Sequence, residues 1–205
     1  MKKEISAPNF DFENELKQMG YVNICGIDEA GRGPLVGNVV AACVIFPEGV
    51  YIEGINDSKK LSESKREKLF EEITSKTIYG VGMASPKEID ELNILNATML
   101  AMHRAVENMK VKPDFALIDG NQSRGFDIPT KTVVKGDSKV ISIAAASIIA
   151  KVTRDRQCIE LDKKYPEYGI AKHKGYPTKF HMDKVRELGP TIDHRMTFLK
   201  FLDKE

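Results

Sequence analysis

The segment YVNICGIDEAGRGPLVGNVVAACVIF, residues 21–46, decides how this chain folds. It begins with an apolar, β-branched run at 21–27 and ends with a second one at 38–46, and both runs predict β-strands. Between them stand two acidic residues, Asp28 and Glu29, followed at once by a Gly-x-Gly sequence. An acidic pair and glycines between two strands make this segment the first candidate site.

The glycines of this segment, Gly31 and Gly33, allow two interpretations. A strand followed by Gly-x-Gly is half of the dinucleotide-binding fingerprint, but Val36 stands where the third glycine is needed. The acidic pair would also oppose a pyrophosphate. Close approach of a glycine backbone to a sugar or a phosphate fits better, with Arg32 supplying positive charge. An ordinary tight turn with an exposed arginine remains the alternative.

Outward from this segment, helical and strand patterns alternate. Further strands are expected at 77–84, 115–118 and 131–134, and helices at 10–19, from Ser62 as N-cap, at 86–92, at 94–109, and from a cap at Asp137 or Ser138 to about residue 164. This order predicts an α/β fold with a mixed sheet. We expect an N-terminal extension at 1–20, a core at 21–164 and a helical C-terminal subdomain at 165–205.

Two more of the predicted strands lead to an acidic residue. The run FALI leads to Asp119, and the run KTVVK leads through a glycine to Asp137. Because ligands of open α/β sheets collect beyond strand ends, these acids could converge with Asp28 and Glu29. Converging carboxylates repel one another unless a cation joins them, and oxygen ligands favour Mg²⁺ or Mn²⁺, two of which could support phosphodiester hydrolysis. Turn chemistry alone would also explain any one of these aspartates.

The composition narrows the class of protein. A chain of 205 residues, 41% hydrophobic and 30% charged, is typical of a soluble globular domain. The three widely spaced cysteines, an odd number, argue against a disulfide framework. The longest apolar runs, 39–46 and 141–150, are too short to span a bilayer, and the first residues lack an apolar signal segment. A reducing cytoplasm is the expected location.

The net charge of +1 hides an asymmetry along the chain. Residues 151–205 hold 13 basic and 9 acidic residues, whereas residues 1–150 hold 18 and 21. A basic C-terminal part on an acidic body suits an enzyme of nucleic acids. Ordinary variation of surface charge explains the same numbers equally well.

Six strings in chain order carry a resemblance to a known family. They are GIDEAGRGPLVGNVVAA (26–42), NDSKKLSESKRE (56–67), LIDGN (117–121), KGDSKVISIAAASIIAKVTRDR (135–156), HKGYPTKFH (173–181) and LGPTIDHRMTF (188–198). Together they resemble the type 2 ribonucleases H, and among these the ribonuclease HII family of bacterial type. The resemblance covers roughly residues 24–201.

This resemblance implies both a fold and an activity. The fold is a ribonuclease H-like mixed five-stranded sheet flanked by helices, with a small C-terminal helical subdomain that contributes to substrate binding. The activity is metal-dependent endonucleolytic cleavage of the RNA strand of RNA/DNA hybrids. It includes cleavage on the 5′ side of a single ribonucleotide embedded in duplex DNA, which leaves a 5′-phosphate and serves ribonucleotide excision repair and primer removal.

The resemblance also implies roles for particular residues. The acids that catalyse and bind Mg²⁺ or Mn²⁺ are Asp28, Glu29, Asp119 and Asp137. The residues that read the ribose 2′-OH are Gly31, Arg32 and Gly33, and Tyr176 matches the tyrosine that stacks on the sugar after the ribonucleotide. Without the family, Tyr176 would be interpreted as a core or turn residue.

Further residues are candidates for contact with phosphates. They are Ser58 and Lys59 in the DSKK segment, together with Arg154 and Arg156. The two arginines could instead pair with Asp155 or Glu160 as solvated helix charges.

Two other functions have to be weighed. A nuclease or strand transferase of the same fold would share the acids, but Tyr176 beside the glycines argues against it. A non-catalytic hybrid-binding module would be expected to lack at least one acid, and all four are present.

Some features are expected to be structural. His173, His181 and His194, spaced by 8 and 13 residues, do not fit common zinc patterns and are expected to be core or solvated residues. The apolar end MTFLKFL, residues 196–202, is expected to pack on the body, although it could serve as a sliding-clamp peptide. A monomer is expected.

Overall fold

The computed structural model describes residues 7–203. Residues 1–6 of the predicted N-terminal extension and residues 204–205 of the predicted C-terminal subdomain lie outside the described residues. Five strands form one sheet in the order β3-β2-β1-β4-β5. Their bounds are β1 (Ile24–Ala30), β2 (Val39–Ile45), β3 (Ile78–Ala84), β4 (Phe115–Asp119) and β5 (Thr130–Val133). The first three strands pair antiparallel, and β1–β4 and β4–β5 pair parallel, which confirms the predicted mixed five-stranded sheet.

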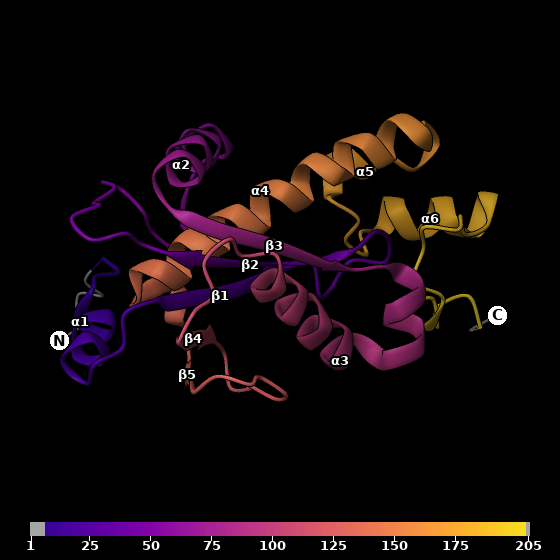
Figure 1. Cartoon of the computed structure of the whole chain (residues 1–205). Coiled ribbons are helices and arrows are strands. Elements are labelled where there is room, and N and C mark those ends of the chain that lie inside the picture. The colour runs from indigo at the N-terminus through magenta and orange to yellow at the C-terminus, as the bar shows by residue number, and fades with distance from the viewer. Residues whose placement is uncertain (1–6, 204–205) are drawn as a thin grey trace, which may run out of the picture.

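Helices cover both faces of the sheet (Figure 1). The helix α3 (Pro86–Glu107) packs on one face, and α2 (Glu63–Lys76) and α4 (Ile141–Lys164) pack on the other. The middle of α4 is rich in alanine and serine, and it lies so close to β1 that a Cβ on Gly26 would meet the backbone of Ser142 at 2.2 Å. Small residues on α4 and a glycine on β1 therefore fix how deeply this helix seats on the sheet. No helix in residues 7–203 has the length and apolar character needed to cross a bilayer.

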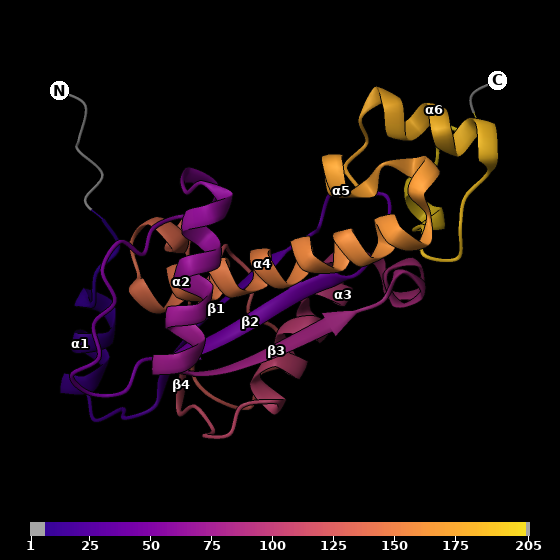
Figure 2. The same cartoon turned by 90° about the horizontal axis from the view of Figure 1, so that it is seen from above.

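The C-terminal part gathers at one end of α4 (Figure 2). It consists of η3 (Pro166–Tyr168), α5 (Ile170–His173), α6 (Lys179–Leu188) and η4 (Met196–Phe198). Its apolar cluster combines residues of this part with residues that follow β1: Leu35, Val36, Cys158, Tyr168, Ile170, Val185 and Leu199. The C-terminal part is thus packed on the segment after β1. Burial of Leu199 confirms that the apolar end packs on the body.

Several helix boundaries follow local signals. The hydroxyl of Ser62 accepts a hydrogen bond from the N–H of Lys65, so the predicted N-cap of α2 is confirmed. The two helical segments predicted at 86–92 and 94–109 form α3 with a kink at Asn93, where φ is 66°. The Asn93 side chain accepts hydrogen bonds from the N–H groups of Leu95 and Asn96 and so caps the second half of the helix.

The predicted cap of α4 is wrong. Asp137 and Ser138 lie in a separate 3₁₀ turn, η2 (Gly136–Ser138), and the N-cap position of α4 is Val140, which has no capping side chain. The cap comes from α1 (Asp11–Gln18) instead. A carboxylate oxygen of Glu13 accepts hydrogen bonds from the N–H (3.1 Å) and the hydroxyl (2.6 Å) of Ser142. A residue distant in sequence supplies this cap, so the local pattern could not reveal it.

Candidate active site

The acidic pair lies within β1, whereas the sequence pattern had predicted that the strand ends before it. Pairing of β1 with β4 stops at Ile27, but pairing with β2 continues through Ala30 and extends the strand. Neighbouring residues of a strand point to opposite faces. Asp28 accordingly shares a cleft with residues of α4, and Glu29 also lines a hollow formed with α3.

The other two acids lie beside the end of β1. Asp119 is the last residue of β4, the neighbour of β1, and its Oδ1 accepts a hydrogen bond from the N–H of Gly136 at 2.6 Å. This bond ties β4 to η2 and so places Asp137 next to Asp119. The Oδ1 of Asp28 accepts a hydrogen bond from the N–H of Glu29 at 2.7 Å. The fold therefore brings all four predicted acids into one neighbourhood.

The charges of these acids act on one another. Burial raises the pKa of Asp28 well above its usual range, and repulsion from Glu29 and Asp119 raises it further. Burial also raises the pKa of Glu29, although Arg32, whose Nη1 lies 3.4 Å from Glu29 Oε1, opposes the rise. Each negative charge in this group thus makes ionisation of the neighbouring carboxyl groups less favourable.

The Asp137 carboxylate is buried but has a cation nearby. Burial raises its pKa, and repulsion from Asp57 and Asp119 adds to the rise, while Lys59 lowers it. The Nζ of Lys59 lies 3.9 Å from Asp137 Oδ2, and the Lys59 side chain is otherwise exposed. Burial lowers the pKa of Lys59, but attraction to the acids outweighs this effect and raises it. Lys59 therefore neutralises part of the negative charge of these acids.

The donor chemistry fits a hard divalent cation, because all four side chains offer carboxylate oxygens. A cation among them would also offset the mutual repulsion of these carboxylates. Within residues 7–203, no three His, Cys, Asp or Glu side chains are already arranged to hold a metal ion. The charge and the ligand type thus fit a metal, and binding one requires these carboxylates to rotate toward each other.

The glycine loop at 31–33 continues directly from the acidic pair. Gly31 has φ +96°, and a Cβ there would lie 2.1 Å from the Nε of Arg154, so a side chain at this position is excluded. A Cβ on Gly33 would lie 3.3 Å from the Tyr176 ring. The structure therefore brings Tyr176 against the loop, as the resemblance implied.

The structure gives neither of the two α4 arginines the expected ion-pair partners, Asp155 and Glu160. Arg154 is buried, and its guanidinium donates hydrogen bonds to the carbonyls of Lys174 (3.0 Å) and Val36 (3.5 Å). Arg156 is exposed but is bonded to Glu67 and Glu71 of α2. Arg154 thus packs against the glycine loop at Gly31, and Arg156 links α4 to α2.

Ser58 and Lys59 lie in η1 (Ser58–Lys60), which packs on α4. The hydroxyl of Ser147 donates a hydrogen bond to the Ser58 hydroxyl at 2.7 Å, and both groups are buried. Lys59, the next residue, is left exposed at the rim beside Asp137. Ser58 is consequently suited to anchor the turn, and Lys59 to meet an anion.

The acidic pair, the glycine loop, η1, part of α4 and Tyr176 all line one cleft of about 360 Å³. Its lining comprises Asp28, Glu29, Ala30, Gly31, Arg32, Gly33, Ser58, Lys59, Ser147, Lys151, Arg154 and Tyr176. Ser147 and Lys151 are not among the residues predicted for the site, although their spacing from Arg154 places all three on one helical face. Tyr176 is 46% exposed, so much of its ring is open to a ligand.

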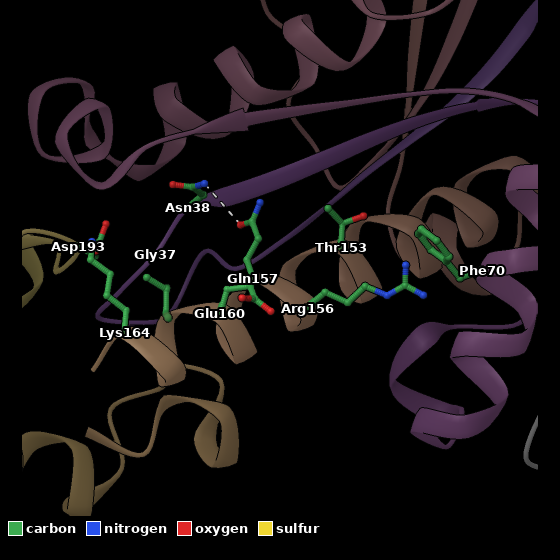
Figure 3. Close-up of a pocket in the computed structure, with 10 residues that line it drawn as sticks. Gly37, Asn38, Phe70, Thr153, Arg156, Gln157, Glu160, Lys164 and Asp193 are labelled. Atoms are coloured by element: carbon green, nitrogen blue, oxygen red, sulfur yellow. Dashed lines mark hydrogen bonds and ion pairs between the residues drawn. The ribbon is translucent and has the colours of Figure 1, made fainter. Parts of the chain in front are cut away.

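A larger hollow of about 600 Å³ lies on another side of α4 (Figure 3). None of the four acids, the glycine loop or Tyr176 contributes to its lining. Its charged groups are already paired, Arg156 with Glu67 and Glu71, and Lys164 with Asp193 at 2.8 Å. Size alone therefore does not mark the chemical site.

Comparison with known proteins gives a consistent result. A family model described as "Ribonuclease HII" matches residues 25–201. The chain is 53% identical over 198 residues, 96% of this chain and 92% of the relative, to a "Ribonuclease HII" of Vibrio parahaemolyticus.

Solved structures show the same likeness. The ribonuclease H2 of Pyrococcus horikoshii has a TM-score of 0.73 and 30% identity, covering 89% of this chain and 98% of that one. A PCNA:RNase HII complex from Archaeoglobus fulgidus has a TM-score of 0.68 and 28% identity, covering 85% and 94%.

Proposed function

The chain belongs to the ribonuclease HII family and is a ribonuclease H, and we propose that it cuts RNA/DNA hybrids and also the 5′ side of a single ribonucleotide embedded in duplex DNA. Cleavage of the RNA strand of RNA/DNA hybrids is the activity of the family. Beyond that activity, we propose cleavage at an embedded ribonucleotide, dependence on a metal ion, and the roles of particular residues. This activity would serve ribonucleotide excision repair and primer removal.

The observation that supports the proposal is the composition of the 360 Å³ cleft. The same cleft is lined by the acidic pair, by the glycine loop and by Tyr176. Groups suited to hydrolysis and groups suited to contact a ribose therefore face one substrate. A glycine backbone can approach a sugar closely, and only a ribonucleotide offers a 2′-OH to it.

The chain's own residues bind and orient the substrate. Lys59 and Arg32 are exposed cations at the rim of the cleft and attract the phosphates of the cut strand. The Tyr176 ring, held beside Gly33, offers a face to the next sugar. These contacts favour placement of the ribonucleotide over the acids.

The metal site we propose consists of Asp28, Glu29, Asp119 and Asp137. The backbone N–H groups of Glu29 and Gly136 hold one oxygen each of Asp28 and Asp119 in place. Bound Mg²⁺ or Mn²⁺ would supply an activated water and stabilise the developing charge in phosphodiester hydrolysis.

A labelled DNA duplex that contains one ribonucleotide tests the function. With Mg²⁺ or Mn²⁺ we expect a cut on the 5′ side of the ribonucleotide that leaves a 5′-phosphate, and no cut with a chelator. An all-DNA duplex is the control and should stay intact. Cutting of long hybrids alone would disprove the proposal for the embedded ribonucleotide.

Thermal unfolding tests the metal site without an activity assay. A ligand that binds the folded state raises the melting temperature. We expect Mg²⁺ or Mn²⁺ to raise that of the wild type and to have a smaller effect on Asp119→Asn. Glu67→Gln, an exposed change on α2, should respond like the wild type. Equal shifts in all three proteins would contradict the assignment.

A protein partner has less support. The Archaeoglobus structure is a complex with PCNA, and contact of this chain with a sliding clamp is a second proposal. The apolar segment that would serve as its peptide is packed, with Leu199 only 3% exposed. Truncation of residues 196–205 combined with a clamp pull-down would test it, and unchanged capture would exclude this segment. We propose that the chain acts as a monomer.

A further inference from the structure

Arg195 lies directly behind the glycine loop and is completely buried. Its Nη2 donates to the carbonyl of Gly31 at 2.7 Å, its Nη1 to that of Arg32 at 3.1 Å, and its Nε to that of Gly37 at 2.9 Å. One planar guanidinium thus binds two carbonyls of the loop and the carbonyl of Gly37, four residues beyond it. The fixed geometry of its donors ties the positions of these carbonyls to one another.

The charge of Arg195 has no carboxylate beside it. Within residues 7–203, neither Arg195 nor the neighbouring Arg154 forms an ion pair within 4.0 Å. Burial and repulsion from the nearby Arg154 together lower the pKa of Arg195 to about 9, so the guanidinium stays protonated at neutral pH. A buried and unpaired cation is costly to keep in a fold unless it has a use or strong compensating contacts.

The contacts of Arg195 determine which way the loop's N–H groups point. In a trans peptide the N–H is directed opposite to the C=O of the same plane. Because the carbonyls of Gly31 and Arg32 face Arg195, the N–H groups of Arg32 and Gly33 face away from it. Neither N–H donates a hydrogen bond to another group in residues 7–203, and both residues line the cleft.

We propose that Arg195 is a positioning residue for cleavage: its buried guanidinium holds the Gly31–Gly33 loop so that the N–H groups of Arg32 and Gly33 face the substrate. It also places a fixed positive charge behind the loop, which favours the approach of a phosphate. This inference rests on the proposed role of the loop in substrate contact. It adds a residue from the C-terminal part that touches neither the substrate nor the acids.

The backbone around Arg195 supports this role. The N–H of Arg195 donates to the carbonyl of Leu35 at 2.8 Å, and the N–H of Leu35 donates to the carbonyl of Gly175 at 2.8 Å. Val36 also forms an isolated antiparallel bridge with His194. The C-terminal part therefore holds the loop through both main chain and side chain, next to Tyr176.

Steady-state cleavage of an RNA/DNA hybrid by Arg195→Lys and Arg195→Ala tests the proposal. The lysine keeps the charge but loses the fork of donors, and the alanine loses both. For Arg195→Ala we expect KM to rise on the order of tenfold to a hundredfold and kcat to fall less. Arg195→Lys should show a smaller rise in KM.

Matched controls separate positioning from a general loss of structure. Arg156→Ala removes an exposed guanidinium from the opposite flank of α4 and should keep the wild-type KM. All variants are assayed at a temperature at which circular dichroism shows them folded. Guanidinium ions at low millimolar concentration should lower the KM of Arg195→Ala, whereas neutral urea should not.

Two results would overturn the proposal. One is a folded Arg195→Lys or Arg195→Ala with the KM of Arg156→Ala. The other is a loss of kcat alone that follows the unfolded fraction and does not respond to guanidinium. If Arg195→Ala does not fold, Arg195→Lys decides by the same KM criterion. Failure of the wild type to cut hybrids would refute the proposed function instead, before any variant is compared.

Discussion

The two ends of the cleft are built in different ways. The acid end, where Asp28 and Glu29 line the cleft and Asp119 and Asp137 lie beside them, stands on β1, β4 and η2. Two of its carboxylates, Asp28 and Asp119, accept hydrogen bonds from the backbone N–H groups of Glu29 and Gly136. The loop end, formed by Gly31–Gly33 with Tyr176, is held by Arg154 and Arg195 from distant parts of the chain.

The difference is one of separation along the chain. The Glu29 N–H that binds Asp28 is one residue away, and the Gly136 N–H that binds Asp119 is 17 residues away. The carbonyls of Gly31, Arg32 and Gly37 that Arg195 binds are 158 to 164 residues away from it in the sequence. The acid end is thus part of the sheet, whereas the loop end depends on the docking of the C-terminal part. Loss of that docking should disturb recognition before it disturbs the acids.

The largest effect is expected at the acid end. Asp28→Asn should lower kcat by about a thousandfold or more, because the site loses a charged metal ligand. Burial and repulsion raise the pKa of Asp28, so removal of its charge should leave the free energy of unfolding at neutral pH unchanged or higher. Hybrid cleavage and urea unfolding measure the two quantities.

A distant acid provides the matched control for Asp28→Asn. Asp127→Asn changes an exposed carboxylate between β4 and β5 and should retain wild-type turnover. Hybrid binding by Asp28→Asn, measured by fluorescence anisotropy, should remain close to that of the wild type. Wild-type turnover by Asp28→Asn would refute the role of the acid end.

The next largest effect concerns a buried histidine pair that supports the loop end. His181 Nδ1 donates to the carbonyl of Tyr176 at 3.1 Å, since a carbonyl can only accept. His194 Nδ1 accepts from the N–H of Thr191 at 3.0 Å. These roles leave His194 Nε2 to donate to His181 Nε2 across 3.2 Å, so both rings are neutral. The prediction that these two histidines belong to the core is confirmed.

Acid should therefore weaken the loop end. Burial lowers the pKa of His194 from 6.5 to about 4, and it also lowers the pKa of His181. A lowered pKa means that the stabilisation is present above pH 6.5 and is lost as the pH falls toward 4. For His194 the loss should reach about 3 kcal/mol at most.

Urea unfolding at pH 7 and pH 5 measures the loss. In His194→Asn, which keeps an acceptor for Thr191, the decrease between these pH values should be smaller than in the wild type. His103→Asn changes a histidine that binds the carbonyl of Arg124 and should keep the wild-type decrease. An identical decrease in all three proteins would contradict the role of the histidine pair.

A smaller and more selective effect is expected at Tyr176. Tyr176→Ala should slow cleavage at a single embedded ribonucleotide by about tenfold, because a stacking face is lost. Long hybrids offer many cleavable positions and should be affected less. Tyr176→Phe keeps the ring and should behave like the wild type on both substrates. An equal loss on both substrates would mean that the ring is a general contact.

The sequence predicted the acid end far better than the loop end. Asp28 and Asp119 could be recognised because each follows an apolar run that reads as a strand, and strands of one sheet bring such residues together. Nothing in the string HRMTF indicates that Arg195 reaches back to Gly31, since long-range packing decides that contact. For the same reason the sequence could not show that Arg154 is buried against Gly31. The cap of α4 was misplaced because Glu13, from another helix, provides it.

The smallest effect is expected at Glu13, a buried acid of α1 that can be compared with the buried Arg195. Glu13 binds Ser142, at the start of α4, through one oxygen, while its second oxygen is buried and has no hydrogen-bond partner among residues 7–203. Burial raises the pKa of Glu13 above 4.5, so its stabilisation is present below that pH and is lost as the pH rises. At pH 7, Glu13→Gln should therefore raise the free energy of unfolding by about 1 kcal/mol.

Urea unfolding at pH 7 and pH 4 decides this prediction. The gain from Glu13→Gln should vanish at pH 4, where the wild-type carboxyl takes up a proton, and cleavage should stay unchanged at pH 7. Glu13→Ala, which leaves the Ser142 groups without an acceptor, should lower stability by about 1–2 kcal/mol instead. A loss of cleavage in Glu13→Gln, like that expected for Arg195→Ala, would show that the acid end also depends on a distant buried charge. The contrast between the two ends would then have to be abandoned.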